Sequence, residues 1–177
     1  MFCSLSKVTF PGAGVAAMAA SRRNIDYILK NMFPMIISFD KLNQVRHIRF
    51  LKDMDGLAAH MEKHRALLEP KFRAVLAILD EGLSGCGSIA RWTKPNGGYF
   101  LSLYTLGGCA KRTVQLCREA GVVLTDAGAA YPYGVDPQDS NIRIAPTFPP
   151  LDELETASRL LCVCVRIATL EKLLQRQ

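Results

Sequence analysis

The sequence lacks any run of about eighteen apolar residues, the length that a membrane-spanning helix requires, so a membrane span is excluded. Aromatic residues are also few, at 8%, and no basic face interleaved with aromatics stands out. The net charge of +6 therefore indicates solubility and an anionic ligand, with no nucleic acid as a partner.

A cysteine pair with metal-binding or redox spacing is missing as well. The six cysteines form no Cys-x-x-Cys motif and no tightly spaced framework. Scattered thiols of this kind are typical of reduced cysteines in the cytosol, so we expect a cytoplasmic protein without disulfides or a cysteine-bound metal.

Acidic residues are absent before Asp26, and this absence allows an alternative interpretation of the first residues as a targeting peptide. A basic, apolar segment with a cleavage-like triplet at residues 17–19 is typical of a signal or transit peptide. However, Pro11, Gly12 and Gly14 would break the hydrophobic helix that such a peptide needs. We therefore favour a different use of these residues.

The first residues instead combine an amine with anion-binding groups. Lys7 lies between Ser6 and a Pro-Gly-x-Gly turn, and an amine held in a dry pocket can form an imine with an aldehyde cofactor. Ser4 and Ser6 can donate hydroxyls to a phosphate, while Gly12 and Gly14 let backbone N–H groups approach it.

The motif is followed by three others in a fixed order: residues 40–47 (DKLNQVRH), 92–100 (WTKPNGGYF) and 141–146 (NIRIAP). Together with Ser-x-Ser-Lys these stretches resemble the pyridoxal-phosphate enzymes with the aspartate aminotransferase fold (fold type I), and within them a subgroup of aspartate aminotransferases. The likeness runs from Ser4 to the C-terminus.

The resemblance implies roles for particular residues. Lys7 would be the catalytic lysine that binds pyridoxal 5'-phosphate and moves the substrate proton, with Ser4, Ser6, Gly12 and Gly14 as cofactor-binding residues. Arg143 would bind the substrate α-carboxylate, although an ordinary strand arginine paired with a surface acid is the alternative that sequence alone favours. Many relatives also clamp the phosphate with an arginine where Val15 stands here.

Two histidines one turn apart, His60 and His64, have a spacing that can bind zinc. Because no third ligand is in view, we expect a solvated helix face and no metal site.

Periodicity predicts an alternation of helices and strands, hence an α/β chain whose last part is an α+β small domain. Short helices are expected at 15–20, 21–33 and 40–51, the second capped by Ser21 and the third by Asp40, and a long helix at 57–83 with a kink at Pro70. Strands are expected at 89–93, 99–103, 122–125 and 142–145, with helices at 113–120 and from 150 onward.

In the terms of the resemblance, residues 1–56 are a remnant of the large cofactor-binding domain, 57–87 the interdomain helix and 88–177 the C-terminal small domain. Only six residues precede Lys7, so most of the large domain is expected to lie outside this sequence.

Two hypotheses follow from the short segment before Lys7. The chain is a truncated C-terminal portion of a homodimeric transaminase for an amino acid, aspartate in this subgroup, and a 2-oxo acid such as 2-oxoglutarate. Alternatively, it is a non-catalytic remnant that acts as a dimerisation or partner-binding module. Genomic DNA upstream of Met1 would discriminate between them, because only the first hypothesis expects an in-frame large-domain sequence there.

Overall fold

The computed structural model describes residues 1–175. It divides into two compact units, Met1–Leu67 and Leu68–Gln177. Within residues 1–175, no helix is both long and apolar enough to cross a membrane.

The first unit begins with a two-stranded antiparallel sheet, β1 (Phe2–Ser4) and β2 (Ala16–Met18), in which Ser4 pairs with Ala16. The helix predicted at 15–20 is therefore wrong. Six residues are too few for a helix to be stable on its own, whereas pairing with β1 satisfies the same backbone groups.

Two capped helices follow, α1 (Arg22–Met32) and α2 (Lys41–Leu51), and both predicted caps are confirmed. Ser21 Oγ accepts the Asn24 N–H at 3.4 Å, and Asp40 Oδ1 accepts the Asn43 N–H at 2.9 Å. These bonds satisfy amides that have no partner inside the first helical turn.

The long helix α3 (Met54–Leu83) starts three residues before the predicted bound and continues through Pro70. Its first part, up to Leu67, belongs to the first unit, and the rest belongs to the second.

The first unit has little apolar core of its own. Among residues 1–67, all of which the structure describes, the buried side chains are Asn43 and His47, and both are polar. Large apolar side chains remain exposed, among them Leu42 at 83% and Ile37 at 84%. The stability of this unit therefore depends on hydrogen bonds more than on buried apolar area.

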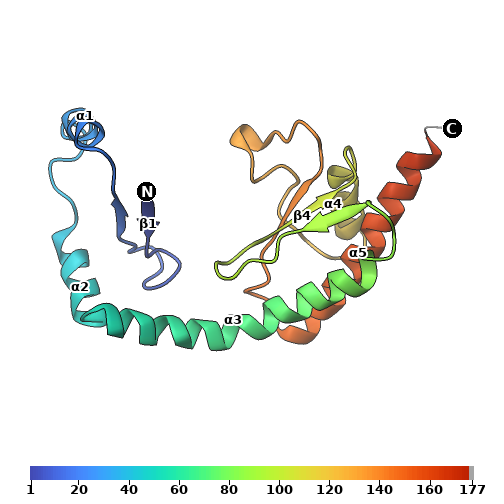
Figure 1. Cartoon of the computed structure of the whole chain (residues 1–177), viewed down its shortest axis with the longest axis horizontal. Helices are drawn as coiled ribbons and strands as arrows, with labels where there is room; N and C mark the ends of the chain where they lie inside the picture. The colour runs from blue at the N-terminus through green and yellow to red at the C-terminus, as the bar shows by residue number, and fades with distance from the viewer. Residues whose placement is uncertain (176–177) are drawn as a thin grey trace. The chain divides into compact units, whose positions relative to one another are not determined.

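The second unit holds a three-stranded antiparallel sheet in the order β3 (Ala90–Trp92), β4 (Leu101–Thr105), β5 (Asn141–Ile144). Figure 1 shows α4 (Ala110–Glu119) and α5 (Leu151–Leu174) running beside this sheet, and these two helices contact each other. A short 3₁₀ turn, η1 (Pro132–Gly134), lies in the loop before β5.

One face of the sheet packs against the helices and forms the core. Its members come from α3, β4, β5, α4 and α5, with β3 packed against them, and include Val75, Leu79, Leu101, Leu103, Ile142 and Val165, each 0% exposed. Alternation along β4 and β5 places the apolar residues on this face. The opposite face carries Ser102 beside Arg143 and Tyr104 beside Asn141.

The strand predicted at 122–125 does not form. Val123 is 80% exposed, and none of the described residues pairs with this stretch in a sheet. The β-rich composition was misleading because a strand needs a neighbouring edge as well as a suitable sequence.

Candidate functional site

Lys7 lies in the loop that joins β1 to β2. The Leu5 N–H donates to Val15 O at 2.8 Å and closes the base of the loop. The Val8 and Thr9 N–H groups both donate to Leu5 O, at 2.9 and 3.0 Å, so residues 5–9 form a tight turn. The Lys7 side chain is exposed on that turn.

The predicted phosphate-binding residues gather beside this turn. Ser4 Oγ and Ser6 Oγ lie 2.8 Å apart, and the Ser6 N–H donates to Ser4 Oγ at 3.2 Å. A Cβ added to Gly14 would lie 2.2 Å from Ser6 Oγ, so only glycine permits this close approach. Gly12, at φ +74°, adopts the left-handed conformation that the turn requires.

Two histidines from α3 reach the same loop, which corrects the expectation of a solvated helix face. His60 Nε2 lies 2.6 Å from the Val8 carbonyl oxygen, and His64 Nε2 lies 3.0 Å from the same atom. The two nitrogens are 3.2 Å apart, and both side chains are half-buried.

His60 and His64 offer only two ligands, whereas zinc takes at least three protein ligands in catalytic sites and four in structural ones. Within residues 1–175, no group of three His, Cys, Asp or Glu side chains is close enough to hold an ion. The two imidazoles instead serve as N–H donors to a backbone carbonyl.

A third histidine supports the loop from α2. His47 is 4% exposed; its Nδ1 lies 2.8 Å from Asn43 O, and its Nε2 lies 2.7 Å from Thr9 Oγ1. Because Asn43 O can only accept, Nδ1 carries a proton. With a neutral ring, Thr9 then donates its one proton either to Nε2 or to Leu5 O, which lies 3.1 Å away.

Aromatic contacts connect these histidines. The Phe10 ring is 5.3 Å from His47 and 5.1 Å from Phe50, and Phe50 is 5.1 Å from His60. Asn43 adds a bond from its side-chain amide to Ala13 O at 2.7 Å. Helices α2 and α3 thus hold the loop at residues 8, 9, 10 and 13.

Arg143 belongs to the second unit, where β5 holds it opposite Ser102. Its guanidinium carbon lies 4.8 Å from the centre of the Phe100 ring, and its Nε is buried without a hydrogen-bond partner among the described residues. No carboxylate in residues 1–175 pairs with it. The surface ion pair that sequence alone favours is therefore not formed.

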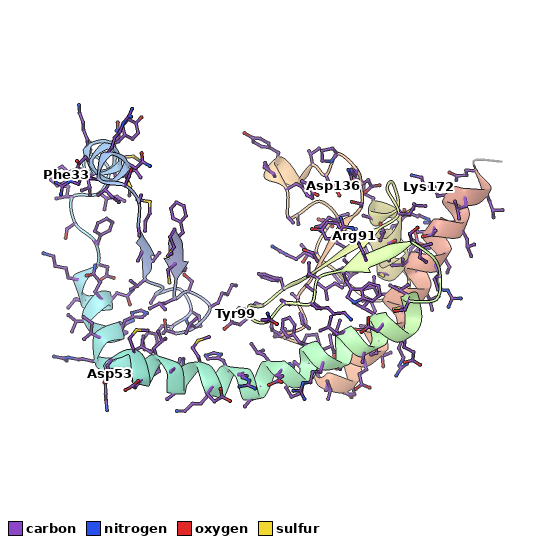
Figure 2. All side chains as sticks on the ribbon, viewed as in Figure 1. Phe33, Asp53, Arg91, Tyr99, Asp136 and Lys172 are labelled. Carbon is purple, nitrogen blue, oxygen red and sulfur yellow. The ribbon has the colours of Figure 1, made fainter. Side chains whose placement is uncertain are left out.

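The turn before β5 is organised by Asp136, labelled in Figure 2. Its carboxylate accepts N–H bonds from Gln138, Ser140 and Asn141 at 2.8–2.9 Å and the Ser140 hydroxyl at 3.3 Å. Burial raises the pKa of Asp136, but these donors outweigh burial and hold the pKa below its ordinary value. The ionised form fixes the start of the strand that carries Arg143.

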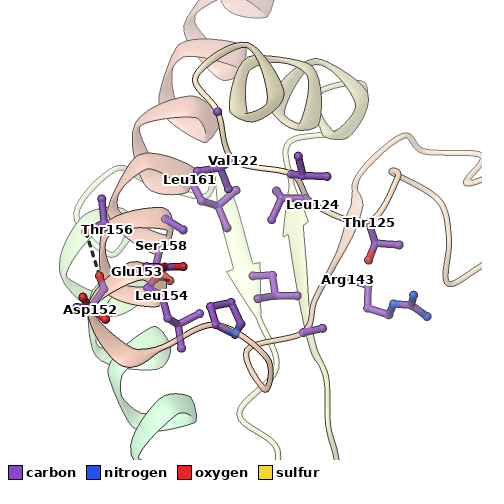
Figure 3. A pocket seen from close by; sticks show the side chains of 16 residues that line it. Val122, Leu124, Thr125, Arg143, Asp152, Glu153, Leu154, Thr156, Ser158 and Leu161 are labelled. Carbon is purple, nitrogen blue, oxygen red and sulfur yellow. Dashed lines mark hydrogen bonds between the residues drawn. The ribbon is translucent and has the colours of Figure 1, made fainter.

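A cavity of about 540 Å³ lies between the start of α5, β5 and residues 121–125. Val122, Leu124 and Leu161 line it, together with the polar groups of Asp152 and Ser158. Figure 3 shows that Arg143 borders this cavity with its stem while its guanidinium points away from the other labelled side chains. The cavity is therefore not the place where Arg143 would bind a ligand.

The structure thus brings together Lys7, Ser4, Ser6 and Gly14 in the first unit, and it places Arg143 in the second. Sequence reasoning missed His47, Asn43 and Asp136. The four-residue spacing of His60 and His64 was noticed, but periodicity cannot show which loop a helix face covers.

The sequence profile of a family described as aspartate amino-transferase matches residues 1–177. An aspartate aminotransferase from Corynebacterium glutamicum is 44% identical over 170 residues, which are 96% of this chain and 39% of that protein. A Mycolicibacterium smegmatis protein, provisionally named an aminotransferase, is 49% identical over 98% of this chain and 40% of its own length.

Among solved structures, an aspartate transaminase from Corynebacterium glutamicum superposes with a TM-score of 0.87 at 43% identity. The match covers 97% of this chain and 40% of that one. The chain therefore spans about 40% of the length of the curated relatives it matches.

Proposed function

The chain belongs to the aspartate aminotransferase family, and from this premise we propose that it is the part of a transaminase that carries the catalytic lysine and the carboxylate-binding arginine. The family depends on pyridoxal phosphate. The proposed substrates are an amino acid, specifically aspartate, and a 2-oxo acid. The observation that carries the proposal is the contact between Ser6 and Gly14 beside Lys7.

The residues around Lys7 fit the cofactor. Ser4 and Ser6 offer two hydroxyls in contact, and the glycine loop removes the side chains that would block a phosphate. An anion bound there would accept one hydrogen bond from each hydroxyl. Without an anion, one hydroxyl donates to the other and the second can donate to water. Bound pyridoxal phosphate would supply an electron sink for the bond broken at the substrate Cα.

Lys7 has two roles in this proposal. Its amine would hold the cofactor, and once it is free the same amine would take up the proton from the substrate Cα and later release it. A lysine amine reacts well when it is withdrawn from water, yet Lys7 is exposed here. We therefore expect the 177-residue chain alone to have little transaminase activity.

Arg143 would bind the substrate α-carboxylate. Its guanidinium meets no carboxylate among residues 1–175, and its Nε is already desolvated without a partner. A bidentate carboxylate would satisfy that donor. The stack on Phe100 and the β5 backbone restrict the side chain, so less freedom is lost when the substrate binds.

The domain assignment stays part of the proposal: residues 1–56 belong to a large cofactor-binding domain, 57–87 to an interdomain helix and 88–177 to a small domain. The exposed apolar side chains of the first unit would be covered by the remainder of the large domain and by the second subunit of a homodimer.

A chimera tests the proposal. The matching 39% of the Corynebacterium glutamicum enzyme is replaced by this chain, and formation of glutamate from aspartate and 2-oxoglutarate is measured. We expect turnover that Lys7→Ala abolishes and that the control Lys30→Ala, at an exposed position of α1, leaves unchanged. A folded chimera without turnover would contradict the proposal.

A second candidate function, a non-catalytic dimerisation or partner-binding module, is favoured by the exposed apolar residues of the first unit. It predicts stable association of the chain and no effect of Lys7→Ala in the chimera.

A further inference from the structure

The Val8 carbonyl receives two imidazole nitrogens from residues more than fifty positions away in the chain. His60 Nε2 is 2.6 Å and His64 Nε2 is 3.0 Å from this oxygen, and the three atoms form a triangle closed by the 3.2 Å contact between the nitrogens. The two rings also touch edge to face, with centroids 4.7 Å apart. Both donors therefore approach the oxygen from nearly the same side.

The Val8 oxygen that accepts these bonds belongs to the Val8–Thr9 peptide, the second peptide after Lys7. On its other side, the Thr9 N–H of the same peptide donates to Leu5 O at 3.0 Å, and the Val8 N–H donates to Leu5 O at 2.9 Å. Both peptide planes after Lys7 are thus fixed by directional bonds. A rotation of the Lys7–Val8 plane would redirect the Cα–Cβ bond of the lysine, and the bonds to the Val8–Thr9 plane hold the residue that follows it.

A buried apolar core does not fix these peptide planes, because the buried side chains of residues 1–67 are Asn43 and His47. His47 holds Thr9, and the Phe10 and Phe50 rings connect it to His60. The position of Lys7 therefore depends on the histidines of two helices.

We propose that His60 and His64 are positioning residues for Lys7: they hold the Val8 carbonyl and thereby set the direction in which the lysine leaves the loop. This inference rests on the proposed function, since the direction matters where Lys7 must reach a substrate Cα. A displacement of about 1 Å in such a group can lower a rate about 100-fold.

The first measurement needs no activity. Amide hydrogen exchange of Val8 and Thr9 is followed in the 177-residue chain and in the double variant His60→Leu/His64→Leu. We expect exchange to be about tenfold faster in the double variant, with α5 unchanged as a control for folding. The matched control Lys63→Leu, at an exposed position between the histidines, should leave exchange unchanged.

His60→Gln/His64→Gln is the conservative pair, because a glutamine amide can donate from about the same position as Nε2. We expect it to restore most of the protection at Val8 and Thr9, and it keeps the test valid if the leucine variant unfolds. Unchanged exchange in both pairs would overturn the proposal, whatever the chain catalyses.

The second measurement uses the chimera. We expect the leucine pair to lower kcat about 100-fold while KM for aspartate changes less than about twofold, because Arg143 is untouched. Faster exchange with unchanged kcat would overturn the positioning role. An inactive parent chimera would count against the proposed function instead, while the exchange result still decides whether the histidines hold the loop.

Discussion

Replacing Arg143 by lysine removes the planar pair of donors while keeping the charge. In the structure, the Arg143 side chain stacks at 4.8 Å on Phe100 and holds a buried Nε that has no partner among the described residues. Lysine has neither the planar group for the stack nor a donor at the Nε position.

The expected cost follows from the lost bond. One charge-assisted hydrogen bond contributes about 1.5–3 kcal/mol, and about 1.4 kcal/mol corresponds to tenfold in affinity. Because the carboxylate is held both before and during the reaction, the loss appears mainly in KM. We expect KM for aspartate to rise about 10- to 150-fold in the Arg143→Lys chimera, with cofactor affinity unchanged.

The assay is steady-state kinetics of the chimera over a range of aspartate concentrations, with pyridoxal phosphate affinity measured in parallel. Arg91→Lys is the matched control, because Arg91 also lies on a strand of the sheet and stacks on an aromatic ring, Tyr104, at 3.9 Å. In the Arg91→Lys chimera, KM for aspartate should change less than about twofold. An unchanged KM for aspartate in Arg143→Lys, together with weaker cofactor binding, would refute the assignment of Arg143 to the substrate.

Four further predictions address the exposed first unit, the loop beside Lys7, the turn before β5 and the thiols. Light scattering should show that the 177-residue chain self-associates at micromolar concentration, because its first unit leaves apolar side chains exposed; a monodisperse monomer would contradict this. Gly14→Ala should lower covalent attachment of pyridoxal phosphate in the chimera, since its Cβ would meet Ser6, whereas Gly85→Ala has open space and should not. Asp136→Asn should reduce the free energy of unfolding at neutral pH, and the difference should vanish as pH falls below about 4, because a carboxylate whose pKa is lowered by folding stabilises only while ionised. Iodoacetamide should alkylate the exposed Cys3 well before Cys117, because burial raises the pKa of Cys117 to about 12.

Local signals in the sequence were sufficient for helices α1, α2 and α3 and for most of the second unit. Ser21 and Asp40 predicted two helix starts correctly because a cap depends on residues three positions apart. Gly121, at φ +90°, follows the end of α4, where a glycine in the sequence indicates that a helix stops. The sheet strands β3 and β5 were found within about two residues because their apolar alternation is strong.

The errors share one cause, which is dependence on residues far away in the chain. Within residues 15–20, Ala16–Met18 form a strand because β1 lies beside them, and 122–125 do not form one because no described strand pairs with them. The role of His60 and His64 depends on a carbonyl 52 and 56 positions away. No periodicity within α3 could have predicted that contact.

The attachment site of the cofactor tests the central claim most directly. The chimera is incubated with pyridoxal phosphate, reduced with borohydride and digested, and the modified peptide is identified by mass spectrometry. The proposal predicts one cofactor per chain on Lys7, and no modified peptide from this segment in the Lys7→Ala variant. Attachment spread over several exposed lysines, or retained in Lys7→Ala, would show that Lys7 is not the catalytic lysine.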